Sequence, residues 1–212
     1  MKLYIPTFGE EIANTISHGV MALLILLFIP FASVWSYLHG GVMEAVTVSI
    51  YLISIFGMTL CSTLYHSMAP QSKHKEVFHI LDHIFIYVAI AGTYTPIALC
   101  VIGGWQGILI TALQWAMVVF GVFYKSLSRR SIPAVSLTIY LVMGWTVVLF
   151  LPLFINNAST SLLWLIGGGG VFYSVGAWFY ARKGFRYHHL VWHLFINIAV
   201  LMHFIAIIFY LY

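Results

Sequence analysis

The stretch YHHLVWHLFINIAVLMHFIAIIFYL, residues 187–211, is apolar over most of its length and carries His189 and His193 near its start. A helix needs about 20 apolar residues to cross the hydrocarbon core of a bilayer, so this stretch predicts a membrane-spanning helix. The two histidines are four residues apart, which places both imidazoles on one helical face, a turn apart. Ionisable side chains inside membrane segments are rare and usually functional, so the pair marks a candidate site.

The whole chain has the composition of a membrane protein. Of its 212 residues, 62% are hydrophobic and 7% are charged, and the mean hydropathy is +1.01, whereas soluble domains typically contain about 25% charged residues. The sequence predicts an all-α integral membrane protein, a seven-transmembrane helix bundle that uses residues 1–212 as one domain. The predicted spans are residues 16–38, 43–66, 80–102, 106–124, 133–153, 161–181 and 189–211.

The basic residues all lie on one side of the predicted spans. They are Lys2, Lys73, Lys75, Lys125, Arg129, Arg130, Arg182, Lys183 and Arg186. The positive-inside rule therefore predicts a cytoplasmic N-terminus and a C-terminus outside. The net charge of +4 then reflects topology and contact with anionic lipid headgroups, and no nucleic-acid partner is expected.

This orientation brings four polar positions to the cytoplasmic ends of the spans. The second span ends at His66, the third has Asp82 in its first turn, and the seventh begins with the histidine pair. Three imidazoles and one water are a common zinc set in enzymes. Asp82 would hold that water or accept its proton, and Ser62, one turn before His66, would orient a ligand.

The spacing alone leaves other interpretations open. A histidine in an apolar helix is often a hydrogen-bonded packing residue, and a pair four residues apart does not by itself define a metal site. His79 and His83 form a second such pair, which could replace His66. His203 lies about 15 Å along the helix from His193, in the outer half of the span, and is predicted to be an interior histidine with satisfied hydrogen bonds.

Four ordered motifs are similar to those of a known family. They are Glu11–His18, Ser62–His66, Leu81–His83 followed by Ala91–Pro96, and His189–His193. With these motifs the chain resembles the haemolysin III proteins, the bacterial branch of the progestin and adipoQ receptor family. The resemblance covers essentially the whole chain. It implies a multi-pass protein of the bacterial inner membrane, with seven helices around a zinc ion near the cytoplasmic face.

The resemblance also implies roles for individual residues. His66, His189 and His193 would be the zinc ligands, Asp82 would contact the zinc-bound water, and Ser62 would be their neighbour. His79 and His83 would then not be ligands.

Three functions remain open at this point. The first is a zinc-dependent hydrolase of lipid amides or esters that acts in membrane-lipid homeostasis, with membrane lipids as substrate. The second is a non-enzymatic sensor or regulator of membrane state with a structural zinc. The third is an oligomeric pore-forming cytolysin, for which the glycines of Gly167–Gly170 would form a close-packing surface, unless they pack within one bundle.

Overall fold

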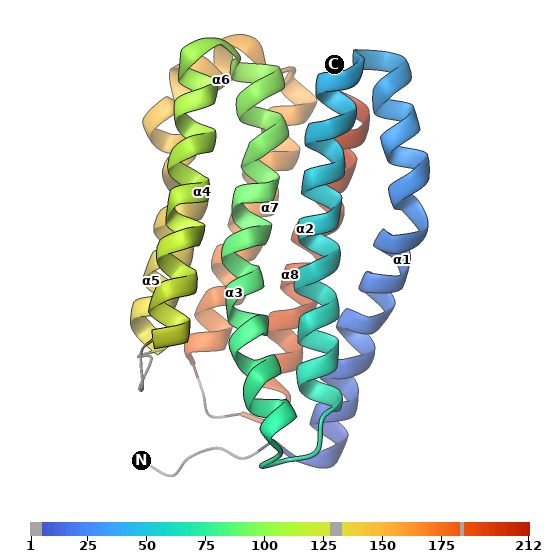
Figure 1. Cartoon of the computed structure of the whole chain (residues 1–212), viewed down its shortest axis with the longest axis vertical. Helices are drawn as coiled ribbons and strands as arrows, with labels where there is room; N and C mark the ends of the chain where they lie inside the picture. Colours follow the sequence, from blue (N-terminus) through green and yellow to red (C-terminus); the bar gives the residue numbers. More distant parts are fainter. Residues whose placement is uncertain (1–5, 128–132, 183–184) are drawn as a thin grey trace.

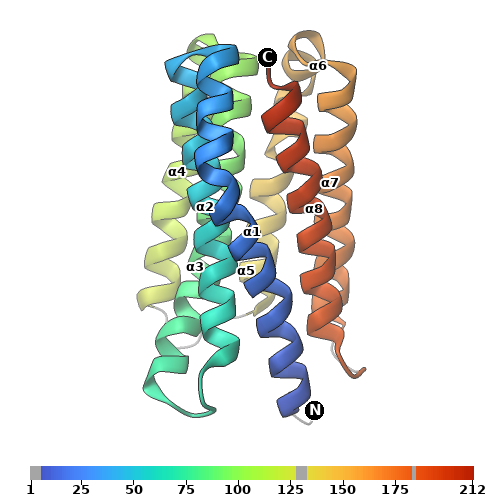
Figure 2. The same cartoon turned by 90° about the vertical axis from the view of Figure 1, so that its right-hand side faces the viewer.

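The computed structural model describes residues 6–127, 133–182 and 185–212, and these residues form a helical bundle without a strand (Figures 1 and 2). The elements are α1 (Phe8–Gly40), α2 (Val42–Ser67), α3 (Lys73–Pro96), the π-helical η1 (Ile97–Ile102), α4 (Gly104–Leu127), α5 (Pro133–Gly144), the 3-10 helix η2 (Trp145–Phe150), α6 (Leu151–Asn157), α7 (Thr160–Ala181) and α8 (His188–Tyr210). Within the described residues, seven helical segments are long and apolar enough to cross a membrane. The predicted seven-helix membrane fold is confirmed.

Two helices begin about two turns before their predicted spans. Thr7 caps α1 in a capping box, in which its hydroxyl accepts from the amide of Glu10 while the Glu10 carboxylate accepts from the amide of Thr7. Ser72 caps α3 by accepting from the amide of Lys75. Caps of this kind satisfy amides that have no partner inside the helix, so both helices extend past the apolar stretch into polar sequence.

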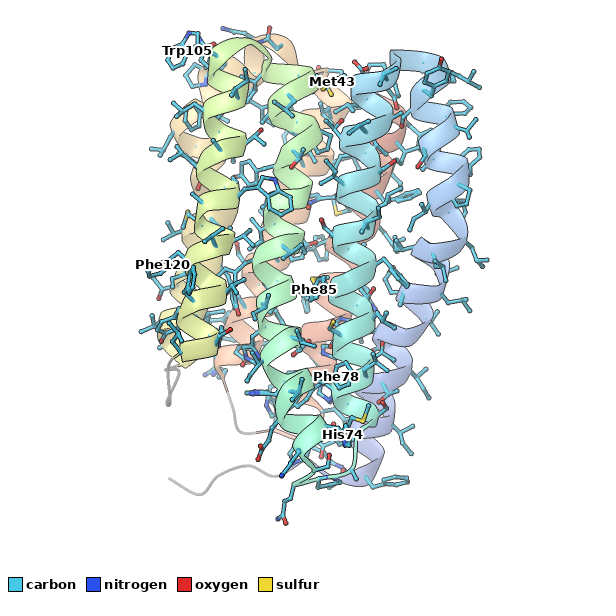
Figure 3. All side chains as sticks on the ribbon, in the orientation of Figure 1. Met43, His74, Phe78, Phe85, Trp105 and Phe120 are labelled. Atoms are coloured by element: carbon cyan, nitrogen blue, oxygen red, sulfur yellow. The ribbon has the colours of Figure 1, made fainter. Side chains whose placement is uncertain are left out.

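The outer surface of the bundle is covered by apolar side chains (Figure 3). Trp105 and Phe120, both on α4, are 68% and 59% exposed, and the surface leucines of the other helices are comparably open. In water such a surface would be strongly unfavourable, whereas acyl chains solvate it. The exterior therefore fits a lipid environment around the whole bundle.

The fifth span is irregular, because a side chain interrupts its hydrogen-bond ladder. The Tyr94 hydroxyl of α3 donates to the carbonyl of Gly144 at 2.7 Å and accepts from the amide of Val147 at 2.8 Å. An inserted hydroxyl of this kind breaks a helical ladder locally and satisfies the freed groups. The span accordingly runs as α5, then the 3-10 helix η2, then α6.

The fifth span also packs loosely. In its most apolar stretch of 18 residues 11% are buried, compared with 56% in the corresponding stretch of α2. Beside it lies a cavity of about 1420 Å³, lined mainly by α3, the fifth span, α7 and α8. Gly167 and Gly170 of α7 line this cavity, and a Cβ added to either would meet no atom within 4 Å. Gly168, which also lines the cavity, and Gly169 lie against Met202 and His203 of α8, so half of the glycine run serves packing inside the bundle.

The described basic residues gather at one end of the bundle, the end at which α1 begins. This basic end carries Lys73, Lys75, Lys125, Arg182 and Arg186. Figure 1 places the C-terminus at the opposite end. Among the described residues, the helix ends there carry no Lys or Arg. Seven crossings place the two termini on opposite sides of the membrane, whichever side is cytoplasmic.

We expect the basic end to face the cytoplasm, because short loops rich in Lys and Arg are retained there. A reporter that is active only in the cytoplasm, fused after Tyr212, should be silent, while the same reporter fused after residue 2 should be active. An active reporter at Tyr212 would show that the orientation is reversed or that the number of crossings in the cell differs from seven.

Candidate metal centre

Three histidines from two helices meet at the basic end. His66 is near the end of α2, and His189 and His193 are in the first two turns of α8. Nε2 of His66 lies 3.2 Å from Nε2 of His189, and one ring nitrogen from each of the three residues lies within 4.8 Å of the others. Two nitrogens bound to a tetrahedral zinc at its usual bond length are about 3.3 Å apart. His66 and His189 therefore have the spacing of two zinc ligands, and His193 lies close enough to join them on one metal ion.

A carboxylate fixes the His66 ring. Nδ1 of His66 lies 2.6 Å from a Glu11 carboxylate oxygen, and the other oxygen of Glu11 pairs with the Lys75 ammonium at 2.9 Å. A ring nitrogen this close to a carboxylate carries the hydrogen and donates it, which leaves the Nε2 lone pair for a metal. Glu11 thus orients His66 and selects its ligand nitrogen.

A hydroxyl orients the His193 ring. The Ser17 hydroxyl donates to the carbonyl of Asn14 at 2.8 Å and lies 3.0 Å from Nδ1 of His193. Because the hydroxyl hydrogen is already used, Nδ1 must donate to Ser17, and Nε2 of His193 is left with its lone pair. The His18 ring stacks on the face of His193 at a centroid distance of 3.6 Å.

The start of α8 is tied to the start of α1 by Glu10. One Glu10 carboxylate oxygen accepts from the backbone amide of Tyr187 at 2.8 Å, and the other accepts from the hydroxyl of Thr7. Tyr187, the residue before α8, has the left-handed φ of 62° and provides no side-chain cap. Glu10 therefore satisfies the amide of the residue before α8 from another helix and holds the α8 histidines beside α1.

Asp82 and Ser62 lie beside the cluster, on facing helices. Both line the cavity, and the Asp82 carboxylate lies within electrostatic reach of the Ser62 hydroxyl and of His66. Asp82 does not belong to the group of side chains within 4.8 Å, so it sits outside the ring of candidate ligands. The role predicted for Ser62, orienting a metal ligand, stays a prediction.

The second histidine pair stays apart from the cluster. His79 and His83 contact each other at a centroid distance of 4.5 Å. Nδ1 of His83 bonds to the His79 carbonyl at 2.8 Å and lies 3.9 Å from Asp82. Across the described part of the chain, the one group of three or more His, Cys, Asp or Glu side chains that lie close enough to share a metal ion is His66, His189 and His193.

Sequence reasoning missed most of the contribution of α1. Glu11, Asn14 and His18 are spaced at i, i+3 and i+7, which places them on one helical face, and that face meets His66 and His193. The available signal was a row of polar residues at helical spacing that leads into the first apolar segment.

The fold and the cluster define a multi-pass α-helical membrane protein with a group of three histidines, two of them buried, that could hold a metal ion. The family described as Haemolysin-III related matches residues 7–204. The chain belongs to this family, which makes it a multi-pass protein of the bacterial cell membrane.

Similar proteins agree with this membership. The chain is 36% identical over 207 residues to the Hemolysin-3 homolog of Bacillus subtilis (strain 168), a match that covers 96% of this chain and 95% of that protein. It is 34% identical to Hemolysin-3 of Bacillus cereus, over 95% of this chain and 91% of that protein. It is also 30% identical to the human Monocyte to macrophage differentiation factor, a progestin and adipoQ receptor relative, over 99% of this chain and 87% of that protein.

Proposed function

We propose that the protein is a zinc-dependent hydrolase of lipid amides or esters that acts in membrane-lipid homeostasis. His66, His189 and His193 would hold the zinc. Among the described residues the cluster contains three imidazoles and no fourth ligand side chain within the same 4.8 Å. Structural zinc sites are normally closed by four protein ligands, whereas catalytic sites keep one position open. This donor set favours a catalytic zinc over the structural zinc of a regulator.

The observation that carries the proposal is that the cluster lies at one end of the large apolar cavity. His66, His189 and His193 all line the cavity, and so do residues near the opposite end of the bundle, such as Thr160. Its volume of about 1420 Å³ exceeds the roughly 300–1,000 Å³ of ordinary small-molecule sites. A long acyl chain fits such a space, with its polar end at the histidines.

The chemistry divides between the metal and the carboxylate. A bound zinc would supply Lewis-acid chemistry by acidifying water and polarising a carbonyl oxygen. Asp82 would accept the proton of the attacking water and return it to the leaving amine or alcohol. Ser62 would steady the neighbouring Asp82 carboxylate, and Glu11 would orient the His66 ring so that Nε2 faces the metal.

The test is fatty-acid release by the purified protein in vesicles that contain a ceramide-like amide or a phospholipid ester. We expect release that stops with a chelator and returns with zinc. Zinc-loaded protein that releases no fatty acid from either substrate would reject the hydrolase in favour of the regulator. Leakage of entrapped dye from the same vesicles would favour the pore that the name of the Bacillus cereus relative suggests.

Glu11→Gln should weaken zinc binding without removing it. The change keeps the size of the side chain but removes the charge that pairs with Lys75 and accepts the hydrogen of His66. Loss of such a partner to a ligating histidine typically costs 10–100-fold in metal affinity, so we expect a shift of about that size in a competition titration with a metal-sensitive dye. Glu44→Gln, at the opposite end of α2, is the matched control. Equal affinities for wild type and Glu11→Gln would contradict this role.

A further inference from the structure

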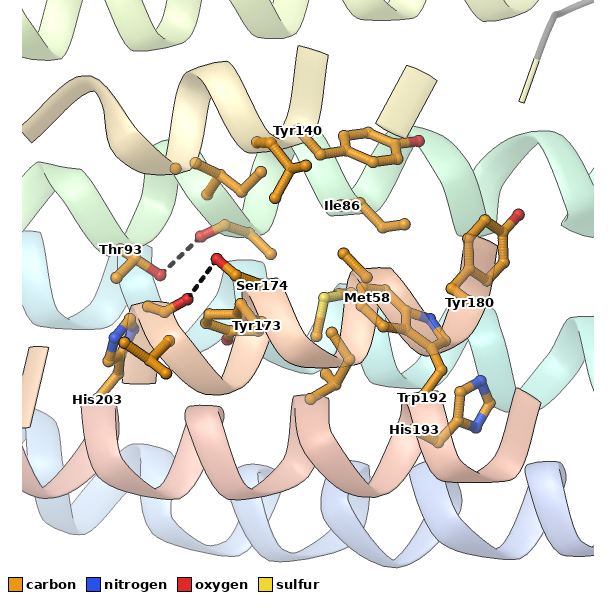
Figure 4. A pocket seen from close by; sticks show the side chains of 18 of the residues that line it. Met58, Ile86, Thr93, Tyr140, Tyr173, Ser174, Tyr180, Trp192, His193 and His203 are labelled. Atoms are coloured by element: carbon orange, nitrogen blue, oxygen red, sulfur yellow. Dashed lines mark hydrogen bonds between the residues drawn. The ribbon is translucent and has the colours of Figure 1, made fainter. Parts of the chain in front are cut away.

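The large cavity beside the fifth span reaches far beyond the candidate metal centre. At its basic end the Tyr180 ring of α7 packs against His189, with centroids 5.7 Å apart. Thr160, at the other end of α7, also lines the cavity, and the twenty residues of continuous helix between them correspond to about 30 Å. Figure 4 shows Tyr180 and His193 at one end of the view and Ser174 further along the cavity. The cavity therefore extends past the depth of one lipid leaflet, which is half of a hydrocarbon core of about 30 Å.

Two glycines form part of the α7 wall beyond Ser174. Gly170 and Gly167 lie about one and two turns further from the metal end than Ser174, and both line the cavity. A Cβ built at either position would meet no atom of the described residues within 4 Å. Glycine weakens the interior of a helix, and its usual role in a membrane helix is close packing against a neighbour. These two glycines have no such neighbour, so they provide open space in the cavity.

The middle two glycines of the run behave differently. A Cβ at Gly168 would clash with the Met202 side chain, and one at Gly169 would clash with the His203 ring. Nε2 of His203 lies 3.1 Å from the carbonyl of Ile166, so the hydrogen bonding predicted for this interior histidine is found at one of its two ring nitrogens. The middle glycines therefore serve packing against α8, and the outer two do not.

The facing wall of the cavity does not fill the space at the outer two glycines. The Trp145 indole of the fifth span donates to the Ser174 hydroxyl at 3.0 Å, which fixes the register of the two antiparallel helices. Val148 and Leu151, three and six residues beyond Trp145, therefore stand about level with the open glycines. Both residues line the cavity, and they are 53% and 40% exposed, so α7 does not cover them. The cavity thus continues between the two walls at a distance of about 15–20 Å from Tyr180.

We propose that Gly170 and Gly167 are the positions that determine specificity for acyl-chain length, and that the ligand is a long-chain acyl lipid whose chain extends past them. This inference rests on the proposed function, in which the reacting carbonyl lies at the histidines. Gly170 is ten residues from Tyr180, or about 15 Å along the helix, so a medium-length chain ends before it and a long chain passes it. A side chain at Gly170 would occupy the path of the long chain and leave the space for the shorter chain unchanged.

The experiment compares stearic acid with decanoic acid, whose chain is little more than half as long. Binding of each radiolabelled acid is measured on purified, zinc-loaded protein in nanodiscs, with empty nanodiscs as the blank. Variant and wild type are compared for the same acid, so partitioning of the acid into the bilayer cancels. We expect Gly170→Leu to bind stearic acid about tenfold more weakly than wild type, the size of a typical overpacking effect. Decanoic acid should bind equally to both proteins.

Two further variants complete the comparison. Gly167→Leu narrows the cavity one turn further from the metal end, so it should weaken stearic acid less than Gly170→Leu does and leave decanoic acid unchanged. It also provides a second measurement if Gly170→Leu folds poorly. Val175→Leu adds bulk to the same helix at a position that is 37% exposed and does not line the cavity. This control should leave the binding of both acids unchanged.

The length limit is overturned if the glycine variants bind stearic acid as tightly as wild type, or if they lose both acids equally. A wild type that binds no stearic acid also overturns it. Binding is measured without turnover, so a clear length limit in a protein that hydrolyses nothing would reject the hydrolase and leave the role of the glycines standing. Hydrolysis of long-chain substrates that Gly170→Leu leaves unchanged would do the reverse.

Discussion

Purified protein should carry about one zinc per chain, and His189→Ala/His193→Ala should carry none. Zinc needs three or four well-placed ligands to bind stoichiometrically at neutral pH, and the double variant leaves one imidazole of the three. His66→Ala alone should also abolish stoichiometric metal, because it removes the ligand that comes from α2. Elemental analysis of protein purified without added chelator measures the metal content directly.

Two further histidines provide the matched control for this prediction. His79→Ala and His83→Ala each remove an imidazole from the same end of the cavity, and neither residue belongs to the three-histidine cluster. Both variants should keep about one zinc. Full zinc in the His189→Ala/His193→Ala protein, or loss of zinc on changing His79, would sink the assignment of the ligands.

The helices were predictable from sequence because each span contains its own signal. An apolar run of about 20 residues predicts a membrane helix, whatever the rest of the chain contains. The residue at which a helix begins depends on polar residues outside that apolar run. Because Thr7 and Ser72 cap α1 and α3, both helices begin before their predicted limits. The irregular fifth span depends on the hydroxyl of Tyr94, which comes from another helix. The sequence of the fifth span does not by itself predict this contact.

The candidate site, too, was predictable in part from the sequence. The sequence was enough to predict that the three histidines lie near one another. Their spacing along one helix and the direction of each span place them at the same end of the bundle. The bond between Glu11 and His66 joins residues 55 positions apart, and the stacking of His18 on His193 joins α1 to α8. Such contacts depend on how helices pack, which hydropathy does not specify. The cavity is equally invisible in sequence, since it is the space that the fifth span fails to fill.

Asp82→Asn should abolish most of the proposed hydrolytic activity while the protein keeps its fold and its zinc. The amide matches the carboxylate in shape but cannot accept the proton of the attacking water, and a general base typically contributes about 10²–10⁴-fold to the rate. Zinc should remain because Asp82 lies outside the cluster of candidate ligands. Fatty-acid release from reconstituted wild type and variant, normalised to measured zinc, gives the comparison.

Glu76→Gln is the control for this change, because it makes the same substitution type at an exposed acid on the same helix. It should leave the rate unaltered. A decrease with Asp82→Asn that exceeds any loss of bound zinc would separate a role in proton transfer from a role in holding the metal. If Asp82→Asn matches the wild-type rate at equal zinc content, Asp82 is not the base.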